Sequence, residues 1–211
     1  GGIDQIRSAT TGGDLHQIEK ALSNMESCVQ YMQQITTDLL LCNKLDGDDL
    51  GMDFEDIETN VQTLITSVLT MLRPSLVKQQ QHGGQVELVS SVSTNLQENS
   101  VFLSQFALKQ ILVNVVVNAI KFTPKGRIQV NATLLPNSIV RVTIQDTGKG
   151  MDPGTMERLF DKYHRRERDT NEFGSAMGMC LVKQLVDRMH GTVAVDSKIG
   201  QGTELTIEVP T

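Results

Sequence analysis

The sequence predicts an α+β fold, an α/β sandwich in which helices cover a mostly antiparallel sheet, preceded by a long coiled-coil-like helix. Three observations predict it. Apolar residues recur three and four apart over residues 15–39, as in the seam of a helical bundle. Segments 127–134 and 139–145 alternate apolar and polar residues on either side of a Pro-Asn-Ser turn, which is typical of a β-hairpin. Helical and strand patterns mix elsewhere without a regular alternation, which argues against a parallel, doubly wound sheet.

The N-terminal part of the chain is expected to be loose over residues 1–13, which are rich in Gly, Ser and Thr. Asp14 fits the N-cap of the long helix, with Gln17 three residues later, and the helix is expected to end near Lys44. One helix cannot bury an apolar stripe alone, so we expect a partner helix or a second copy of the chain, unless the stripe packs on its own domain. The stripe consists of Leu15, Ile18, Leu22, Met25, Val29, Met32, Thr36 and Leu39.

The later elements follow from runs with strand or helix periodicity, bounded by turn residues. Before the hairpin we expect strand 50–54, helix 55–80 with Pro74 kinking it or ending its regular part, turn 82–84, strand 85–90, polar loop 95–100 and helix 102–122. After the hairpin we expect a charged segment over 151–173, a helix from Gly174 to about His190, and strands 192–197 and 203–209.

The composition excludes several classes of protein. A net charge of −6 argues against nucleic acid as a partner, because phosphate backbones attract basic surfaces. The sequence has no apolar run of membrane-spanning length and does not begin like a signal peptide. Its three cysteines lie far apart among apolar residues, and no Cys/His cluster has the spacing of metal ligands. We therefore expect reduced thiols, no direct membrane contact and a cytoplasmic location, either of a whole protein or of the cytoplasmic part of a membrane sensor.

Three polar residues share one face of the apolar helix predicted over 102–122. Asn114, Asn118 and Lys121 are four and three residues apart, so they lie above one another on consecutive turns. Amide oxygens suit a hard cation, and an ammonium group suits phosphate, so this face is a candidate metal and polyphosphate site. The alternative is that the amides cap neighbouring loops and the lysine reaches water.

Two later loops carry residue types that a nucleotide site needs. Asp146 ends a strand just before Gly148 and Gly150. A carboxylate fixed there can accept a hydrogen bond from an exocyclic amine such as that of adenine, and the glycines let a flat ring approach. Gly174 to Gly178 opens a helix whose N–H groups suit phosphate, and the basic segment before it has the character of a lid. Each pattern alone is also compatible with an ordinary turn, helix start or solvated charge run.

Taken in order, these motifs resemble those of the catalytic, ATP-binding domain of sensor histidine kinases. This Bergerat-type ATP-binding fold is shared with gyrase B, the ninety-kilodalton heat-shock chaperones and MutL. The resemblance covers about residues 85–211. The matching segments are 114–123 for the N box, 146–150 for the first glycine box, 159–163 for the phenylalanine box, 174–178 for the second glycine box and 200–203 for the closing Gly-Gln-Gly-Thr.

The resemblance implies that the chain binds ATP and Mg²⁺. Asn118, together with Asn114, would coordinate the metal, and Lys121 would contact phosphate oxygens. Asp146 would hold the adenine amine. The other implied contacts are Gly148 and Gly150 around adenine, Thr203 near the ring, Gly174 and Gly178 at the lid hinge and phosphate site, Phe160 and Tyr163 as lid anchors, and Arg165 at the γ-phosphate. Catalytic roles would thus fall to Asn118, Lys121 and Arg165.

The resemblance also implies a histidine protein kinase of a two-component system. Residues 14–54 would be part of a dimerisation hairpin that forms a four-helix bundle, and residues 55–211 would be the catalytic domain. The helix at 14–45 would pair in a homodimer through a partner helix that is missing from this chain. The γ-phosphoryl group would pass to a histidine on the hairpin and then to the receiver domain of a response regulator.

Two departures from the family pattern leave alternatives open. No histidine is followed by an acidic residue and then Thr-Pro or Asn-Pro, as the family's H box requires, so His16, His82 and His190 do not fit the acceptor. Ala176 stands where the family usually has Gly, which costs about 1 kcal/mol if that position needs a positive φ, and Met177 and Met179 stand where it usually has Leu. The alternatives are an ATP-binding dimerisation module that signals without phosphotransfer, and another ATPase of the same fold.

Overall fold

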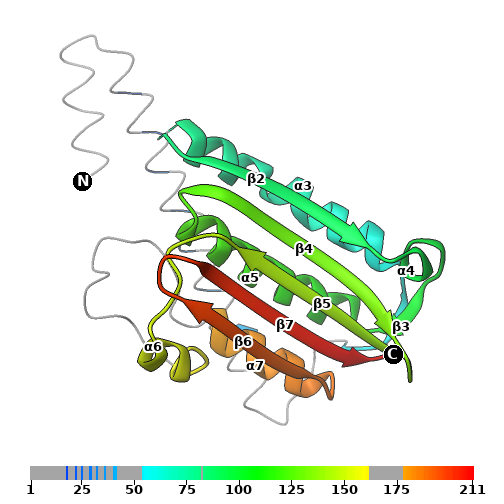
Figure 1. The fold of residues 1–211 in the computed structure, drawn as a ribbon. Coiled ribbons are helices and arrows are strands. Elements are labelled where there is room, and N and C mark those ends of the chain that lie inside the picture. Colours follow the sequence, from blue (N-terminus) through cyan, green and yellow to red (C-terminus); the bar gives the residue numbers. More distant parts are fainter. Residues whose placement is uncertain are drawn as a thin grey trace.

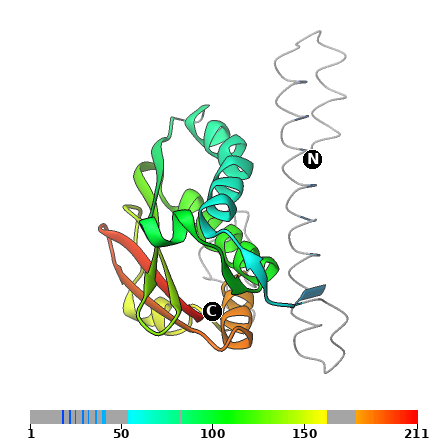
Figure 2. The ribbon, with the colours of Figure 1, turned by 90° about the vertical axis from the view of Figure 1, so that its right-hand side faces the viewer.

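The computed structural model describes residues 54–81, 83–161 and 178–211, together with eight helical positions between 18 and 41. In the described part, a five-stranded sheet forms one layer and three long helices form a second layer on one of its faces (Figure 1). The view turned by 90° shows the two layers edge-on, with the helices on one side only (Figure 2). This arrangement confirms the predicted fold class.

The main sheet has the strand order β2-β4-β5-β7-β6. The β2–β4 pair is parallel and the other three pairs are antiparallel, so the sheet is mixed but mostly antiparallel. The predicted hairpin is β4 and β5, in register from Ile128 opposite Asp146 to Leu135 opposite Ile139. The strands are β2 (Gln85–Val92), β4 (Lys125–Leu135), β5 (Ile139–Asp146), β6 (Thr192–Lys198) and β7 (Gly202–Pro210).

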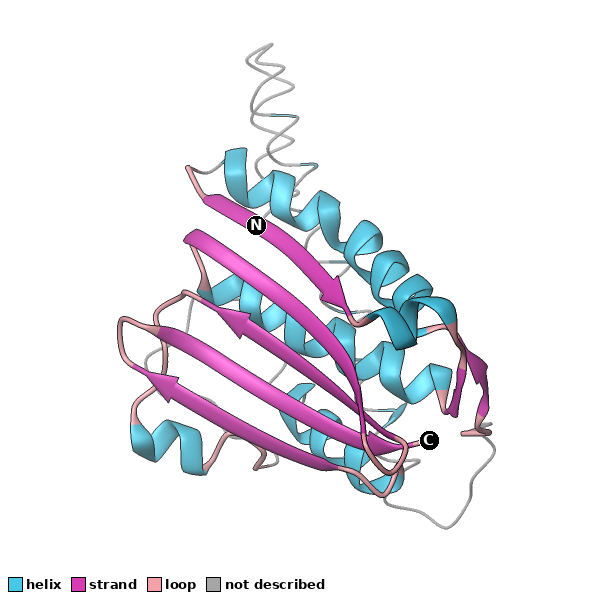
Figure 3. Cartoon of the chain, turned by 45° about the vertical axis from the view of Figure 1, so that its right-hand side comes forward, coloured by secondary structure: helices cyan, strands magenta, loops and turns pink. Residues whose placement is uncertain are grey.

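Three helices cover the sheet, α3 (Val61–Gln81), α5 (Gln105–Phe122) and α7 (Gly178–Arg188) (Figure 3). The core lies between the layers, and α5 is its centre, since nine of its residues are buried. The opposite face of the sheet is polar and carries ion pairs such as Arg127 with Glu87 at 2.9 Å. No helix in the described residues is both long and apolar enough to cross a membrane.

Capping residues explain where two helices begin, and there the predicted boundaries were wrong. The helix predicted from residue 55 begins at Val61, because the side chain of Asn60 accepts the Thr63 N–H at 2.8 Å. The helix predicted from residue 102 begins at Gln105, because the Ser104 hydroxyl accepts the Ala107 N–H at 3.3 Å. The residues before each cap form a small antiparallel sheet of β1 (Ile57–Thr59) and β3 (Val101–Leu103).

Other predicted elements differ from the observed ones in type or in bounds, or lie outside the described residues. The polar loop predicted at 95–100 is largely a short helix, α4 (Thr94–Glu98), and a further short helix, α6 (Pro153–Glu157), lies in the charged segment. Pro74 lies inside α3, which continues to Gln81. Residues 50–53 of the predicted strand lie outside the described residues, and Phe54 belongs to no strand.

A pair of neighbouring valines on α5 tests this packing. Val116 is fully buried, whereas Val117 is 39% exposed. We expect Val116→Ala to lower the free energy of unfolding by about 2 kcal/mol, because it leaves a cavity in the core. We expect Val117→Ala to change it by less than about 0.5 kcal/mol, since an exposed position loses little packing. Urea unfolding of both variants measures the difference, and equal effects would contradict the placement of α5.

Candidate functional site

Asp146 is held between two neighbouring strands at the end of β5. It is opposite Ile128 of β4 on one side and Thr203 of β7 on the other. Its carboxylate oxygen Oδ1 accepts the backbone N–H of Gly148 at 2.8 Å. A half-buried carboxylate fixed in this way has a defined direction in which it can accept a further hydrogen bond from a ligand.

The environment of Asp146 changes its acidity. Burial raises the pKa of this carboxyl above its ordinary value of 3.8, and this effect is larger than the opposing ones. The Gly148 N–H, the hydroxyl of Thr123 and the N–H of Thr203 donate hydrogen bonds to the carboxylate and lower the pKa in part. Asp146 is therefore a desolvated acceptor that these hydrogen bonds keep in one orientation.

The loop after Asp146 connects two parts of the site. Lys149 donates its N–H to the carbonyl of Phe122 at the end of α5, at 3.1 Å, and its carbonyl accepts the N–H of Gly200 at 2.8 Å. Gly150 has φ +65°, and a Cβ there would collide with the carbonyl of Lys198, so only glycine fits without strain. The loop thus links the end of α5 to the turn between β6 and β7.

The polar face predicted on α5 is present and faces the start of α7. Asn114 is buried, with 6% exposure, and its Nδ2 donates to the carbonyl of Gln110 at 3.0 Å. A Cβ on Gly178, the first residue of α7, would lie 2.7 Å from the Asn114 Oδ1. Asn118 and Lys121 continue the same face and are partly exposed. Glycine at 178 therefore lets α7 begin directly against the amide of Asn114.

The amide face fits a hard cation in its donor chemistry. Carbonyl-type oxygens are ligands that Mg²⁺ accepts, usually with phosphate oxygens and water completing its shell. Asn118 is partly exposed, and its amide offers one such oxygen. The described residues contain no group of three His, Cys, Asp or Glu side chains that could hold a metal. A metal on this face would therefore depend on the amides and on the ligand's own oxygens.

The structure places most, but not all, of the predicted site residues. It brings Asp146, Gly148 and Thr203 together, and Phe160 packs against the core. Tyr163, Arg165, Gly174 and Ala176 lie outside the described residues.

Sequence reasoning missed two residues that support the site. Thr123 is fully buried and hydrogen-bonds the Asp146 carboxylate. The hydroxyl of Ser197 lies 3.0 Å from the hydroxyl of Thr203 and accepts the N–H of Met151 at 2.9 Å. Thr123 directly follows the polar helix face in the sequence, but no sequence signal connects it with Asp146.

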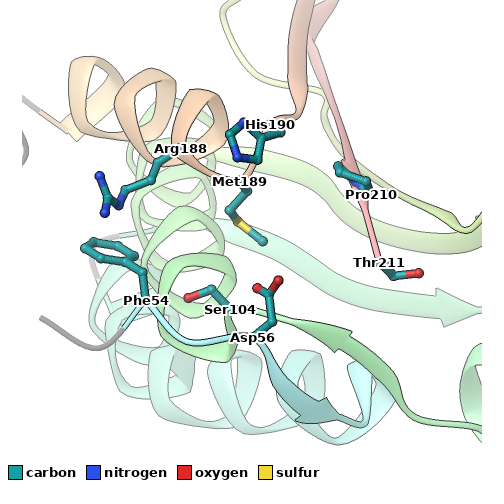
Figure 4. Close-up of a pocket in the computed structure, with 8 residues that line it drawn as sticks. All are labelled: Phe54, Asp56, Ser104, Arg188, Met189, His190, Pro210 and Thr211. Carbon is teal, nitrogen blue, oxygen red and sulfur yellow. The ribbon is translucent and has the colours of Figure 1, made fainter.

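A cavity of about 540 Å³ lies at the other end of the helices (Figure 4). Pro210, which lines it, is seven residues along β7 from Thr203, or roughly 23 Å at ~3.3 Å per residue. Beside the cavity, the guanidinium of Arg188 lies 4.9 Å from the ring centroid of Phe54, and Phe54 packs edge-to-face on Phe106 at 5.7 Å. No predicted site residue lines this cavity. The contacts of Phe54 with Arg188 and Phe106 instead hold the segment before β1 against α5 and the end of α7.

Comparisons with known proteins show which families and folds this chain is similar to. The family model described as histidine kinase-, DNA gyrase B-, and HSP90-like ATPase matches residues 104–211. The sensor histidine kinase GacS of Pseudomonas protegens is 31% identical over 97% of this chain and 23% of its own length. The autoinducer 2 sensor kinase/phosphatase LuxQ of Vibrio parahaemolyticus is 39% identical over 59% of this chain and 15% of its own length.

The solved structures show the same fold. Full-length ShkA in complex with AMPPNP superposes with a TM-score of 0.74 at 25% identity, over 92% of this chain and 39% of that one. The catalytic domain of the histidine kinase ThkA superposes with a TM-score of 0.63 over 74% of this chain and 95% of that one, and at 21% identity it supports the fold alone. The chain spans about a quarter or less of the length of the curated relatives.

The acidity of Asp146 can be measured directly. We expect the carboxyl carbon of Asp146, followed by NMR, to titrate with a midpoint above 3.8, because burial is the dominant effect. Thr123→Val should raise the midpoint further, since it removes a hydrogen bond to the ionised form. The same substitution at Thr133, on the exposed side of β4, is the matched control and should leave the midpoint unchanged.

The sign of the linked stability change follows from the raised pKa. The folded state holds the Asp146 proton more tightly than the unfolded state, so the contribution of Asp146 to the free energy of unfolding falls as pH rises from 3.8 through the folded-state pKa. A midpoint at or below 3.8 would contradict both statements.

Proposed function

The chain belongs to the family of histidine kinase-, DNA gyrase B- and HSP90-like ATPases, and we propose that it is the Mg·ATP-binding catalytic part of a sensor histidine kinase. In this proposal the γ-phosphoryl group of ATP passes to a histidine on a dimerisation hairpin. From there it passes to an aspartate of a receiver domain. The sensor kinases among its relatives support the assignment to two-component signalling.

One observation carries the proposal: a backbone hydrogen bond joins the loop after the half-buried carboxylate of Asp146 to the end of the helix that bears the amide face. The Lys149 N–H bonds to the carbonyl of Phe122, which ends the helix that bears Asn118 and Lys121. A ligand with a planar amine-bearing base at Asp146 would have its polar tail directed along α5. Adenine nucleotides have this shape and this distribution of charge.

Each residue has a physical role in phosphoryl transfer, which needs positioning and neutralisation of charge more than covalent chemistry. Asp146 accepts a hydrogen bond from the adenine amine and fixes the base. Lys121 places an ammonium group at the phosphate oxygens. Asn118 and Asn114 would hold Mg²⁺, which neutralises charge on the phosphates when it is bound. From its place in the sequence, we assign Arg165 to the γ-phosphate, and Tyr163 and Gly174 to the lid.

The exposed apolar stripe supports the proposed domain division, with residues 14–54 as a dimerisation segment and 55–211 as the ATP-binding domain. Six stripe positions are helical, Ile18, Leu22, Met25, Val29, Met32 and Thr36. Met25 is 37% exposed and Met32 is 58% exposed in the single chain. Burying such side chains removes apolar area from water, so association with a second helix is favourable. We therefore propose that this segment contributes to a homodimer.

The assignment of the metal ligands is tested by Asn118→Ala. We expect the variant to lose detectable Mg·ATP binding in a calorimetric titration, because an alanine offers no oxygen to the metal. Adenosine should still bind, since Asp146 is unchanged. Val117→Ala, at the exposed neighbouring position, is the control and should bind Mg·ATP normally. Near-native affinity of Asn118→Ala would remove Asn118 from the metal site.

The transfer step is tested with a protein that also carries the dimerisation hairpin and its histidine, as the proposal requires. After incubation with γ-labelled ATP, we expect a phosphoprotein whose label is lost in acid and kept in alkali, as phosphohistidine is. The variant Asp146→Ala of the same protein should carry no label. Binding of ATP without any acid-labile phosphoprotein would favour the alternative, a module that binds ATP and signals through its conformation.

A further inference from the structure

Two lysines from different parts of the chain hold their ammonium groups over one aromatic ring. The Nζ of Lys121, in the last turn of α5, lies 4.7 Å from the ring centroid of Phe122. The Nζ of Lys149, in the loop after Asp146, lies 4.4 Å from the same centroid. An aromatic face attracts cations through its quadrupole, so the ring of Phe122 is a shared contact for both charges.

The position of Phe122 brings Lys149 to the nucleotide site. Asn114, Asn118 and Phe122 are spaced four residues apart on α5, so the partly exposed ring lies one turn beyond Asn118 on the same side of the helix. The backbone of Lys149 is fixed on both sides, through Phe122 and through Gly200. Its side chain therefore starts from a rigid point and ends on the face that carries the proposed metal ligands.

The electrostatics favour an anion here. Both ammonium groups lie within 5 Å of one ring centre, so a polyphosphate that reached this ring would be attracted by two positive charges. Phe122 holds the two cations near the ring before a ligand arrives, which reduces the reorganisation that binding requires.

We propose that Lys149 is a second cationic binding residue for the polyphosphate, acting together with Lys121, and that Phe122 is the positioning residue for both. The proposal rests on the proposed function, because it assigns Lys149 to the same ATP site. It predicts a division of roles within one loop, in which Asp146 recognises the base and Lys149 recognises the phosphates. A ligand without phosphates should therefore be insensitive to Lys149.

The test compares ATP with adenosine in equilibrium titrations of parent and variants. We expect Lys149→Gln to weaken ATP binding about tenfold, the order of a hydrogen bond to a charged group, and to leave adenosine binding unchanged. The salt dependence of ATP affinity should also become shallower, since one cation is lost. Lys109→Gln is the matched control, because Lys109 is an exposed lysine on α5, about 18 Å from Lys121 along the helix.

Two substitutions at Phe122 test its positioning role. Phe122→Leu keeps an apolar side chain but removes the aromatic face, and we expect a smaller loss for ATP than in Lys149→Gln, again with adenosine unaffected. Phe122→Tyr retains the face and should bind ATP like the parent. Thermal melting of each variant separates a loss of folding from a loss of phosphate contact, since a purely structural role would affect both ligands.

The outcomes separate this proposal from the function it rests on. If the parent binds ATP and Lys149→Gln binds it equally well, the role of Lys149 is wrong and the ATP site stands. If Lys149→Gln weakens adenosine as much as ATP, the substitution disturbs the loop and the phosphate role is also wrong. If the parent fails to bind ATP, the proposed function and this inference fall together.

Discussion

The structure depends on helix α5, which must be apolar where it packs in the core and polar where it faces the candidate site. The residues of α5 that pack against the sheet and the other helices, among them Leu108, Ile111 and Val116, are fully buried. The same helix carries Asn114, Asn118 and Lys121 along a single narrow face, and the buried member, Asn114, bonds back to its own helix at Gln110. Glycine at position 178 lets α7 pack against that face, because a Cβ there would lie 2.7 Å from the amide oxygen of Asn114.

Much of this could be predicted from the sequence, because the relevant signals are local. The hairpin of β4 and β5 follows from alternation around one turn, and its far end places Asp146 where a strand stops. The polar face of α5 follows from spacing alone. The resemblance to sensor histidine kinases added what spacing could not, namely the expectation that Asp146, 28 residues after Asn118, belongs to the same site.

The parts that could not be predicted depend on contacts distant in sequence or on single capping atoms. The sequence pattern predicts that residues 57–59 lie at the start of a helix. They form β1 instead, because Val101–Leu103 pairs with them. The hydrogen bond from Thr123 to Asp146 joins the end of a helix to the end of a strand. Nothing in the sequence of either segment predicts that the two residues are in contact. The parallel pairing of β2 with β4 is likewise a property of the assembled sheet, since β2 has no hairpin partner beside it in the sequence.

The two halves of the site differ in how firmly the protein fixes them, and this difference has a consequence for binding. The carboxylate of Asp146 stands on a strand paired on both sides, with hydrogen bonds to Gly148, Thr123 and Thr203, so its geometry is set before a ligand arrives. The proposed phosphate side includes the long side chains of Lys121 and Lys149, which both lie against the ring of Phe122. A rigid Asp146 carboxylate would favour one base over others, because it cannot move to restore the hydrogen bond to a base that is out of position. In the proposed function, flexible cationic side chains suit the phosphates, whose charge and position change during transfer, so the proposed site combines a rigid contact at the base with adjustable contacts at the phosphates.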